Sequence, residues 1–234
     1  MRLVWFMGML SLLGSGVVFA EKVVHGEVVK AGPGACPAVA LTYDLCPVRT
    51  PPGLDAELIE FLATREIPAT FFMSGKWMTR HDAAVKQLLA VPSFEVGTHG
   101  YVHAHLPVHD IEFQMREIAE PVALLKSRYG HDAKLFRPPY GEFNDATLEA
   151  VKSLGLRFIM WSIESGDPDP TLSADAILAR IKKRLKPGSI IVLHANGKGY
   201  HTKQVTEDLI TTVLPARGLR PMTISDLLSC QPAD

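Results

Sequence analysis

The sequence predicts an α/β fold in which a parallel sheet closes, or nearly closes, into a barrel with helices outside. Short apolar segments rich in β-branched or aromatic residues alternate with longer segments whose apolar residues recur every three or four positions. This alternation is typical of a parallel sheet covered by helices. Polar residues suited to chemistry also follow the ends of the strand-like segments, where such barrels place their active sites.

Seven segments have the length and composition of buried strands, with few charges and many β-branched or aromatic residues. In chain order they are Val39–Asp44, Ala69–Ser74, Phe94–Thr98, Lys134–Arg137, Arg157–Ile163, Ser189–His194 and Pro221–Ile224.

Six segments between them show the apolar spacing of amphipathic helices. In chain order they are Leu54–Arg65, Ala83–Leu89, Ile111–Tyr129, Asp145–Leu154, Ala174–Leu185 and Thr206–Leu214. Asn144 or Asp145 can cap the fourth of these helices, and Ser173 can cap the fifth.

The chain begins with the features of a secretory signal. Arg2 is followed by an apolar stretch over Leu3–Phe19, and small residues lead up to Ala20. We expect cleavage there, which makes residues 1–20 a signal peptide and residues 21–234 a single domain in the periplasm or outside the cell. An uncleaved anchor is the alternative, because the apolar stretch is near the lower length limit for a span. No stable membrane span is expected after cleavage.

Charge and cysteine content restrict the choice further. The formal net charge of −1 excludes a polybasic nucleic-acid binder. Of the three cysteines, Cys36 and Cys46 are ten residues apart in an extended segment, a separation of roughly 30 Å. We therefore predict a disulfide between Cys36 and Cys230, with Cys46 left as a free thiol.

Two histidines four residues apart, His99 and His103, can face one metal ion. Alone the pair is weak evidence, since the chain holds nine histidines. Four other segments strengthen it, because each also carries a polar residue at or just after a strand end. Together the five are Thr42-Tyr-Asp-Leu-Cys-Pro47, His99-Gly-Tyr-Val-His103, Arg137-Pro-Pro-Tyr-Gly141, Trp161-Ser-Ile-Glu-Ser-Gly-Asp167 and Ile191-Val-Leu-His194.

In this order and spacing the five segments resemble the polysaccharide deacetylases with a NodB homology domain, carbohydrate esterase family 4. The resemblance extends over roughly residues 38–228. It implies a distorted (β/α) barrel of seven to eight parallel strands. It also implies a divalent metal, with Zn²⁺ expected and other transition metals open, and a polysaccharide or oligosaccharide substrate.

The resemblance also assigns roles to individual residues. His99 and His103 match the two histidine metal ligands, and Asp44 matches the general base. Arg137 matches the arginine that holds this base, and the backbone N–H of Tyr140 matches an oxyanion donor. His194 matches the general acid and Asp167 the acid that orients it, with Glu164 at the preceding acidic position.

The first segment departs from the family pattern, which has a second, metal-binding aspartate where this chain has Leu45. Three interpretations follow. Asp44 itself can become the third ligand beside His99 and His103, which is the arrangement we predict. Cys46 can instead supply a thiolate, because residues 44 and 46 of an extended segment share a face. Finally, the site can have lost its metal.

Several aromatic and polar residues are candidates for sugar contacts. Trp77 and Tyr101 could stack on a sugar ring, and Asn196 or His201 could bind its hydroxyls. Trp161 is expected in the core because its segment is apolar.

The function that we predict is an exported, metal-dependent removal of N-acetyl groups from amino sugars of a cell-wall or envelope polysaccharide. A hydrolase of another amide or of an O-acetyl ester is one alternative. A glycan-binding protein without catalysis is the other.

Overall fold

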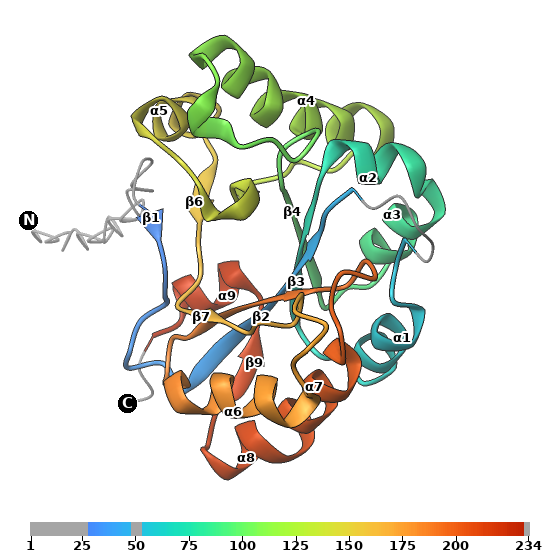
Figure 1. Ribbon diagram of the computed structural model, residues 1–234, viewed down its shortest axis with the longest axis vertical. Coiled ribbons are helices and arrows are strands. Elements are labelled where there is room, and N and C mark those ends of the chain that lie inside the picture. The colour runs from blue at the N-terminus through green and yellow to red at the C-terminus, as the bar shows by residue number, and fades with distance from the viewer. Residues whose placement is uncertain (1–27, 48–52, 232–234) are drawn as a thin grey trace, which may run out of the picture.

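The computed structural model describes residues 28–47 and 53–231 (Figure 1). The predicted signal peptide over residues 1–20 lies outside this part of the chain. Among the described residues, no helix has the length and apolar character needed to cross a membrane.

The centre of the fold is a sheet whose strands all pair in parallel. Its spatial order is β1-β6-β5-β4-β3-β2-β8-β7, and β9 pairs with β2. In chain order the strands are β1 (Val28–Val29), β2 (Ala38–Leu45), β3 (Ala69–Met73), β4 (Phe94–Thr98), β5 (Leu135–Phe136), β6 (Arg157–Ile159), β7 (Ile163–Glu164), β8 (Ile190–His194) and β9 (Arg220–Met222). The predicted distorted α/β barrel is thus confirmed as a partial barrel.

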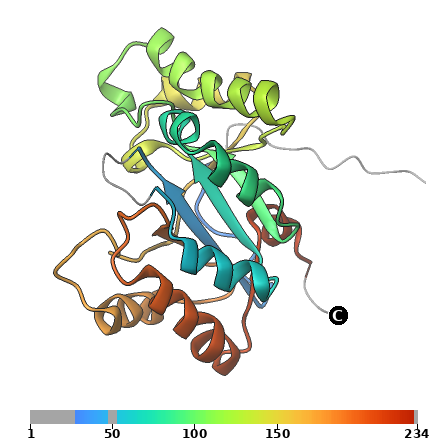
Figure 2. The same ribbon diagram turned by 90° about the vertical axis from the view of Figure 1, so that its right-hand side faces the viewer.

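Helices cover the outside of the sheet. Figures 1 and 2 show α4 and α5 on one side and α6, α7 and α8 on the other, with α1 to α3 beside the central strands. The helices are α1 (Ala56–Thr64), α2 (Gly75–Arg80), α3 (Asp82–Leu89), α4 (Ile111–Tyr129), α5 (Asp145–Ser153), α6 (Ala174–Arg184), α7 (Thr202–Asp208), α8 (Leu214–Ala216) and α9 (Ile224–Ser229). Their apolar faces pack on the sheet as one large buried cluster and two smaller ones.

The predicted strand over Arg157–Ile163 is two strands. Its first part, β6, pairs with β1 and β5, whereas β7 pairs with β8 at the other end of the sheet order. Between them the Met160 N–H donates to the Val29 carbonyl, and the Ser162 N–H donates to the Ile190 carbonyl. One short segment therefore bridges the two edges of the sheet, and this crossing is the distortion of the barrel.

Smaller differences lie at element ends. The predicted strand Pro221–Ile224 stops at Met222, because the Thr223 side chain caps α9 by accepting from the Asp226 N–H. The predicted helix Thr206–Leu214 is α7, a π-helical turn over Leu209–Val213, and α8.

The predicted disulfide between Cys36 and Cys230 is confirmed, and Cys46 is free and buried. The disulfide joins the segment before β2 to the end of α9. It therefore ties the C-terminal helix to the central strand and leaves the one remaining thiol for another role.

Candidate active site

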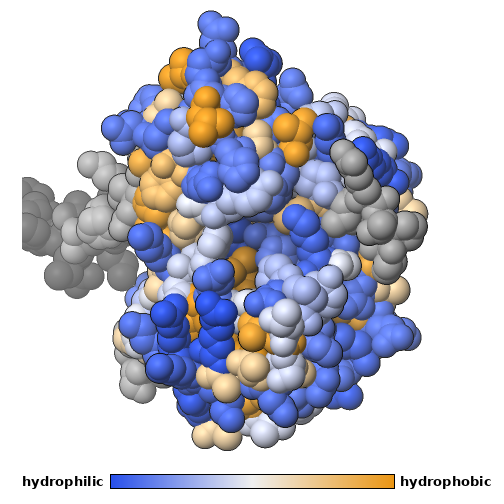
Figure 3. All heavy atoms as spheres, viewed as in Figure 1, coloured by the Kyte–Doolittle hydropathy of each residue, from blue (hydrophilic) through white to orange (hydrophobic). Residues whose placement is uncertain are grey.

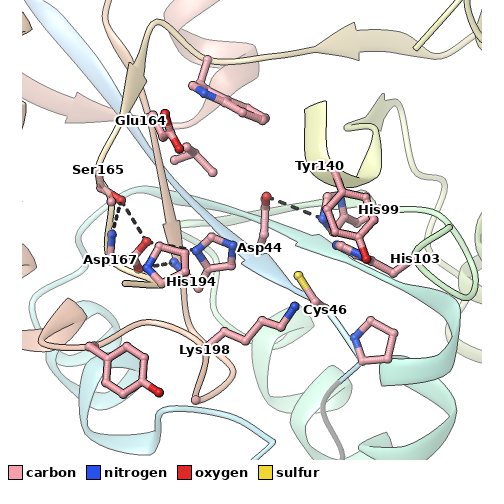
Figure 4. A pocket seen from close by; sticks show the side chains of 17 residues that line it. Asp44, Cys46, His99, His103, Tyr140, Glu164, Ser165, Asp167, His194 and Lys198 are labelled. Atoms are coloured by element: carbon pink, nitrogen blue, oxygen red, sulfur yellow. Dashed lines mark hydrogen bonds and ion pairs between the residues drawn. The ribbon is translucent and has the colours of Figure 1, made fainter. Parts of the chain in front are cut away.

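Strand β2 sends alternate side chains to opposite sides. Leu45 is fully buried in the main apolar cluster, whereas Asp44 and Cys46 line a cavity at the carboxyl end of the sheet (Figure 4). The cavity has a volume of ≈ 790 Å³. Figure 3 shows that the face of the molecule is hollowed near its centre, with hydrophilic side chains around the hollow. The leucine that breaks the family pattern therefore belongs to the core, and Cys46 takes a place at the site.

His99 and His103 enter the same cavity from the loop after β4. The His99 Nδ1–H donates to the Arg137 carbonyl over 2.9 Å, which leaves Nε2 facing the cavity. Histidine ligands of metals typically donate their other ring N–H to a carbonyl or carboxylate in this way.

The loop that carries these histidines has an unusual backbone. Gly100 and His103 both have a φ of 66°, which for His103 costs about 1–3 kcal/mol. The buried Glu117 carboxylate of α4 holds the loop by accepting from the Tyr101 N–H at 3.1 Å and the Val102 N–H at 3.0 Å. Glu117 was not predicted as a site residue.

Three ligand atoms meet here, one each from Cys46, His99 and His103, and all lie within 4.8 Å of one another. Burial alone would raise the pKa of the Cys46 thiol, but hydrogen bonds from His103, His194 and His99 hold that pKa well below its usual range. A thiolate and two imidazoles are a ligand set that Zn²⁺ accepts. The residues therefore fit a metal ion.

Asp44 is not part of this group of three. The Arg137 Nη1 donates to Asp44 Oδ1 at 2.9 Å, and Asp44 Oδ2 lies 3.6 Å from His99 Nε2. Burial raises the pKa of Asp44, but the charges of Arg137, His99 and His194 and the hydrogen bond from Arg137 together outweigh it, and the pKa is lowered overall. Asp44 is thus held as a carboxylate beside the two histidines, and the group of three ligand atoms that the structure brings together includes Cys46 and not Asp44.

Arg137 is fully buried and connects several parts of the site. Besides Asp44, its guanidinium donates to Thr42 Oγ1 at 2.8 Å and to the Met160 carbonyl at 3.2 Å. It also lies over the Phe72 ring at 4.1 Å. A fork with this many fixed partners orients the carboxylate as well as neutralising it.

The opposite wall carries His194 and Asp167. The His194 Nδ1–H donates to Asp167 Oδ1 at 3.0 Å, and the His194 backbone N–H donates to Oδ2 at 2.8 Å. Ser165 Oγ and Thr202 Oγ1 also donate to this buried carboxylate, at 2.9 and 2.8 Å. Burial lowers the pKa of His194, but hydrogen bonds to Asp167 and Cys46, together with the charges of these two groups, outweigh it and raise that pKa to about 10. His194 is therefore a cation at neutral pH.

Tyr140 lies at the mouth of the cavity. Its φ of 60° is left-handed, and its ring stacks on His105 at a centroid distance of 3.9 Å and meets the edge of His103 at 4.4 Å. Within residues 28–47 and 53–231, its backbone N–H donates to no protein group. It is available as a hydrogen-bond donor to a bound ligand.

Two of the expected sugar contacts, Trp77 and Asn196, are corrected, and so is the expected place of Trp161. Trp77 is fully buried, and its Nε1 donates to the Gly53 carbonyl, so it cannot stack on a sugar. Trp161 is half-buried: it packs against one of the smaller core clusters and also lines the cavity, because its segment crosses between the two edges of the sheet. Asn196 is buried, and its side chain donates to the Cys46 carbonyl at 2.5 Å. Asn196 thus helps to position Cys46.

Glu164 also lines the cavity, but it is exposed and its nearest cation, Arg180, is 3.8 Å away. Among the described residues it forms no hydrogen bond or ion pair with His194 or Asp167. Sequence reasoning missed Ser165, Thr202 and Glu117, which form hydrogen bonds around the site. Short polar residues and a single helical acid give no distinguishing pattern in one sequence.

Comparison with known proteins supports a shared origin for this arrangement. Residues 31–159, more than half of the chain, match the profile of the family described as polysaccharide deacetylase. The chain is 28% identical over 213 residues to a chitooligosaccharide deacetylase from Rhizobium leguminosarum bv. phaseoli, covering 87% of this chain and 90% of the relative.

Two solved structures resemble the fold closely. The crystal structure of a peptidoglycan N-acetylglucosamine deacetylase has a TM-score of 0.77 at 25% identity, covering 88% of this chain and 95% of the other. A CE4 family pseudoenzyme from Bacillus anthracis has a TM-score of 0.76 at 22% identity, covering 87% and 69%. The second likeness is one of fold alone.

Proposed function

Because this chain belongs to the polysaccharide deacetylase family of hydrolases, we propose that it removes N-acetyl groups from amino sugars of a cell-wall or envelope polysaccharide. We propose further that it is exported and that it depends on a divalent metal ion, with Zn²⁺ the best match to its ligand atoms.

One observation carries the proposal. A buried set of three metal-ligand atoms and a hydrogen-bonded acid, His194, line the same cavity, with a carboxylate, Asp44, beside them (Figure 4). Amide hydrolysis needs activated water, a polarised carbonyl and a proton for the leaving nitrogen. The cavity brings together residues suited to each need.

Cys46, His99 and His103 would hold the metal. When bound, a divalent metal supplies Lewis acidity that polarises the carbonyl and makes water more acidic. The remaining work falls to the chain's own side chains.

Proton transfer divides between two residues. Asp44, ionised and oriented by Arg137, accepts a proton from the attacking water. The water oxygen bonds to the acetyl carbon, the carbon–nitrogen bond breaks, and His194 gives its proton to the departing nitrogen. Acetate and a free amino sugar result, and the Asp167 carboxylate keeps His194 in place throughout.

The Tyr140 backbone N–H helps to stabilise the acetyl oxygen during the reaction. This donor, which has no partner among the described residues, lies at the cavity mouth and suits the negative charge that develops on the acetyl oxygen. The adjoining His105 and His103 rings limit the movement of the Tyr140 side chain, and so help to hold its left-handed backbone.

The test is release of acetate by purified residues 21–234 from a panel of N-acetylated glycans, before and after EDTA and after added zinc. We expect release that EDTA abolishes and zinc restores. A protein that binds glycans with zinc present but releases no acetate contradicts the proposal and supports the non-catalytic alternative. Release from O-acetyl esters alone supports the esterase alternative.

A further inference from the structure

A second, smaller cavity adjoins the candidate active site. Its volume is ≈ 210 Å³, and it shares four lining residues with the larger cavity. These are Pro47, His103, Tyr140 and Lys198. A substrate with its N-acetyl group near His103 would therefore extend a neighbouring substituent into this space.

The lining of the smaller cavity is strongly basic. Lys76, Arg80 and Lys198 contribute to it, and no aspartate or glutamate among the described residues does. None of the three forms a salt bridge within the described part of the chain. The whole chain has a formal net charge of −1, so this concentration of positive charge is local.

The position of these cations is built into the fold. Lys76 and Arg80 are four residues apart on α2 and so share a helix face. The Gly75 and Lys76 N–H groups donate to the Gly100 and Tyr101 carbonyls, which docks the start of α2 against the loop of the metal ligands.

Lys198 comes from the other side, on the loop after β8, and reaches into the larger cavity beside Cys46 (Figure 4). Its loop is anchored by Asn196, whose side chain donates to the Cys46 carbonyl and accepts from the Lys198 N–H at 3.4 Å. Glu164, the exposed acidic residue of the larger cavity, does not line the smaller, basic one.

We propose that the small cavity is an anion subsite, and that the substrate carries a carboxylate or phosphate on or next to the N-acetylated sugar. This inference rests on the proposed function and names a class of substrate for it. Three cations that form no salt bridge with any described residue surround one polar space and suit an anion, because charge-assisted hydrogen bonds are the stronger kind.

The experiment compares matched substrates. One is an N-acetylated glycan with free carboxylates on alternate sugars, and the other is the same glycan with those carboxylates reduced to alcohols. We expect kcat/KM to be about tenfold or more higher for the acidic glycan, mainly through KM, and to fall with added salt. An N-acetylated oligosaccharide with a phosphate on the neighbouring sugar identifies which anion is preferred.

Variants locate the effect. Arg80→Ala and Lys198→Ala should each lower the ratio of the two specificity constants several-fold, and Arg80→Glu should lower it further. Lys152→Ala, an exposed lysine of α5 outside both cavities, should keep the wild-type ratio. All but Lys198 are exposed, so folding should survive their substitution.

Equal rates on all substrates by the wild-type protein would overturn the subsite, as would an acidic preference that survives Arg80→Glu. Absence of hydrolysis on any glycan instead contradicts the proposed function. In that case calorimetry on His194→Ala measures the affinities for the acidic glycan and for its reduced form. About tenfold tighter binding of the acidic glycan supports the subsite, and equal affinity rejects it.

Discussion

The two walls of the cavity differ in how completely the polar groups on them find partners within the protein. On the acid wall, four donors surround the Asp167 carboxylate, and His194 is fixed by both its ring and its backbone. On the metal wall, Cys46, His99 and His103 turn their ligand atoms toward one another. The comparison teaches that the polar groups of the acid wall have their partners within the folded chain, whereas the ligand atoms of the metal wall are arranged to share a cation.

The largest effects should separate the two walls. His99→Ala should lose most bound zinc and reduce acetate release to background. His194→Ala should keep near-stoichiometric zinc yet lose about 10²–10⁴-fold in kcat, the usual scale of general acid catalysis. Metal analysis and kinetics on the same preparations check this. Zinc loss in both variants would show that the walls are not independent.

The next prediction concerns pH. Asp167, together with Cys46, raises the pKa of His194 to about 10, so His194 stays protonated up to alkaline pH, and the rate should hold over that range. In Asp167→Asn the pKa of His194 should fall toward its ordinary value of about 6.5, and the rate should decline as pH rises through that lower range. A kcat–pH profile measures both. If the rate of the variant held up to the same alkaline pH as wild type, His194 and Asp167 would not be the groups that transfer the proton.

A substitution of Glu117 tests whether its hydrogen bonds to the loop of His99 and His103 support metal binding. Glu117→Gln keeps the side-chain size but weakens the charge-assisted hydrogen bonds to the Tyr101 and Val102 N–H groups. We expect zinc affinity to fall by about 10–100-fold, the range for such supporting partners, and added zinc to restore the rate. Glu120→Gln, on the same helix but with an exposed side chain, is the matched control. Equal zinc affinity in the two variants would assign Glu117 to stability alone.

The smallest effect on chemistry should come from the disulfide, which lies away from both walls. Replacing Cys36 and Cys230 together by alanine should lower the free energy of unfolding by about 2–5 kcal/mol. Zinc content and kcat should remain close to wild type at low temperature. Denaturant unfolding and metal analysis check this, and lost zinc in the folded double variant would link the disulfide to the site.

Much of the fold follows from pattern alone. Strand β4 and helix α4 have the predicted bounds, because an apolar strand and a long amphipathic helix leave clear periodic signals. The split between β6 and β7 leaves no such signal in the sequence, since the choice of strand partners depends on contacts far along the chain. Helix α2 was missed because it is short and begins with glycine.

The site shows the same division. Asp44, His99, Arg137, Asp167 and His194 are brought together as the resemblance implied. The sequence could not show whether Asp44 or Cys46 lies closer to both histidines, because the two residues share a strand face and only the packing around them distinguishes their surroundings. The fixed partner of Asp44 is Arg137, whereas Cys46 lies with the two histidines.

The most direct test is zinc per chain, by mass spectrometry after zinc exposure and dialysis, in wild type, Cys46→Ser and Asp44→Asn, with unfolding curves to confirm that each variant is folded. We predict near-stoichiometric zinc in wild type and Asp44→Asn, and little in Cys46→Ser. Full zinc in Cys46→Ser with loss in Asp44→Asn would contradict our assignment and return Asp44 to the metal.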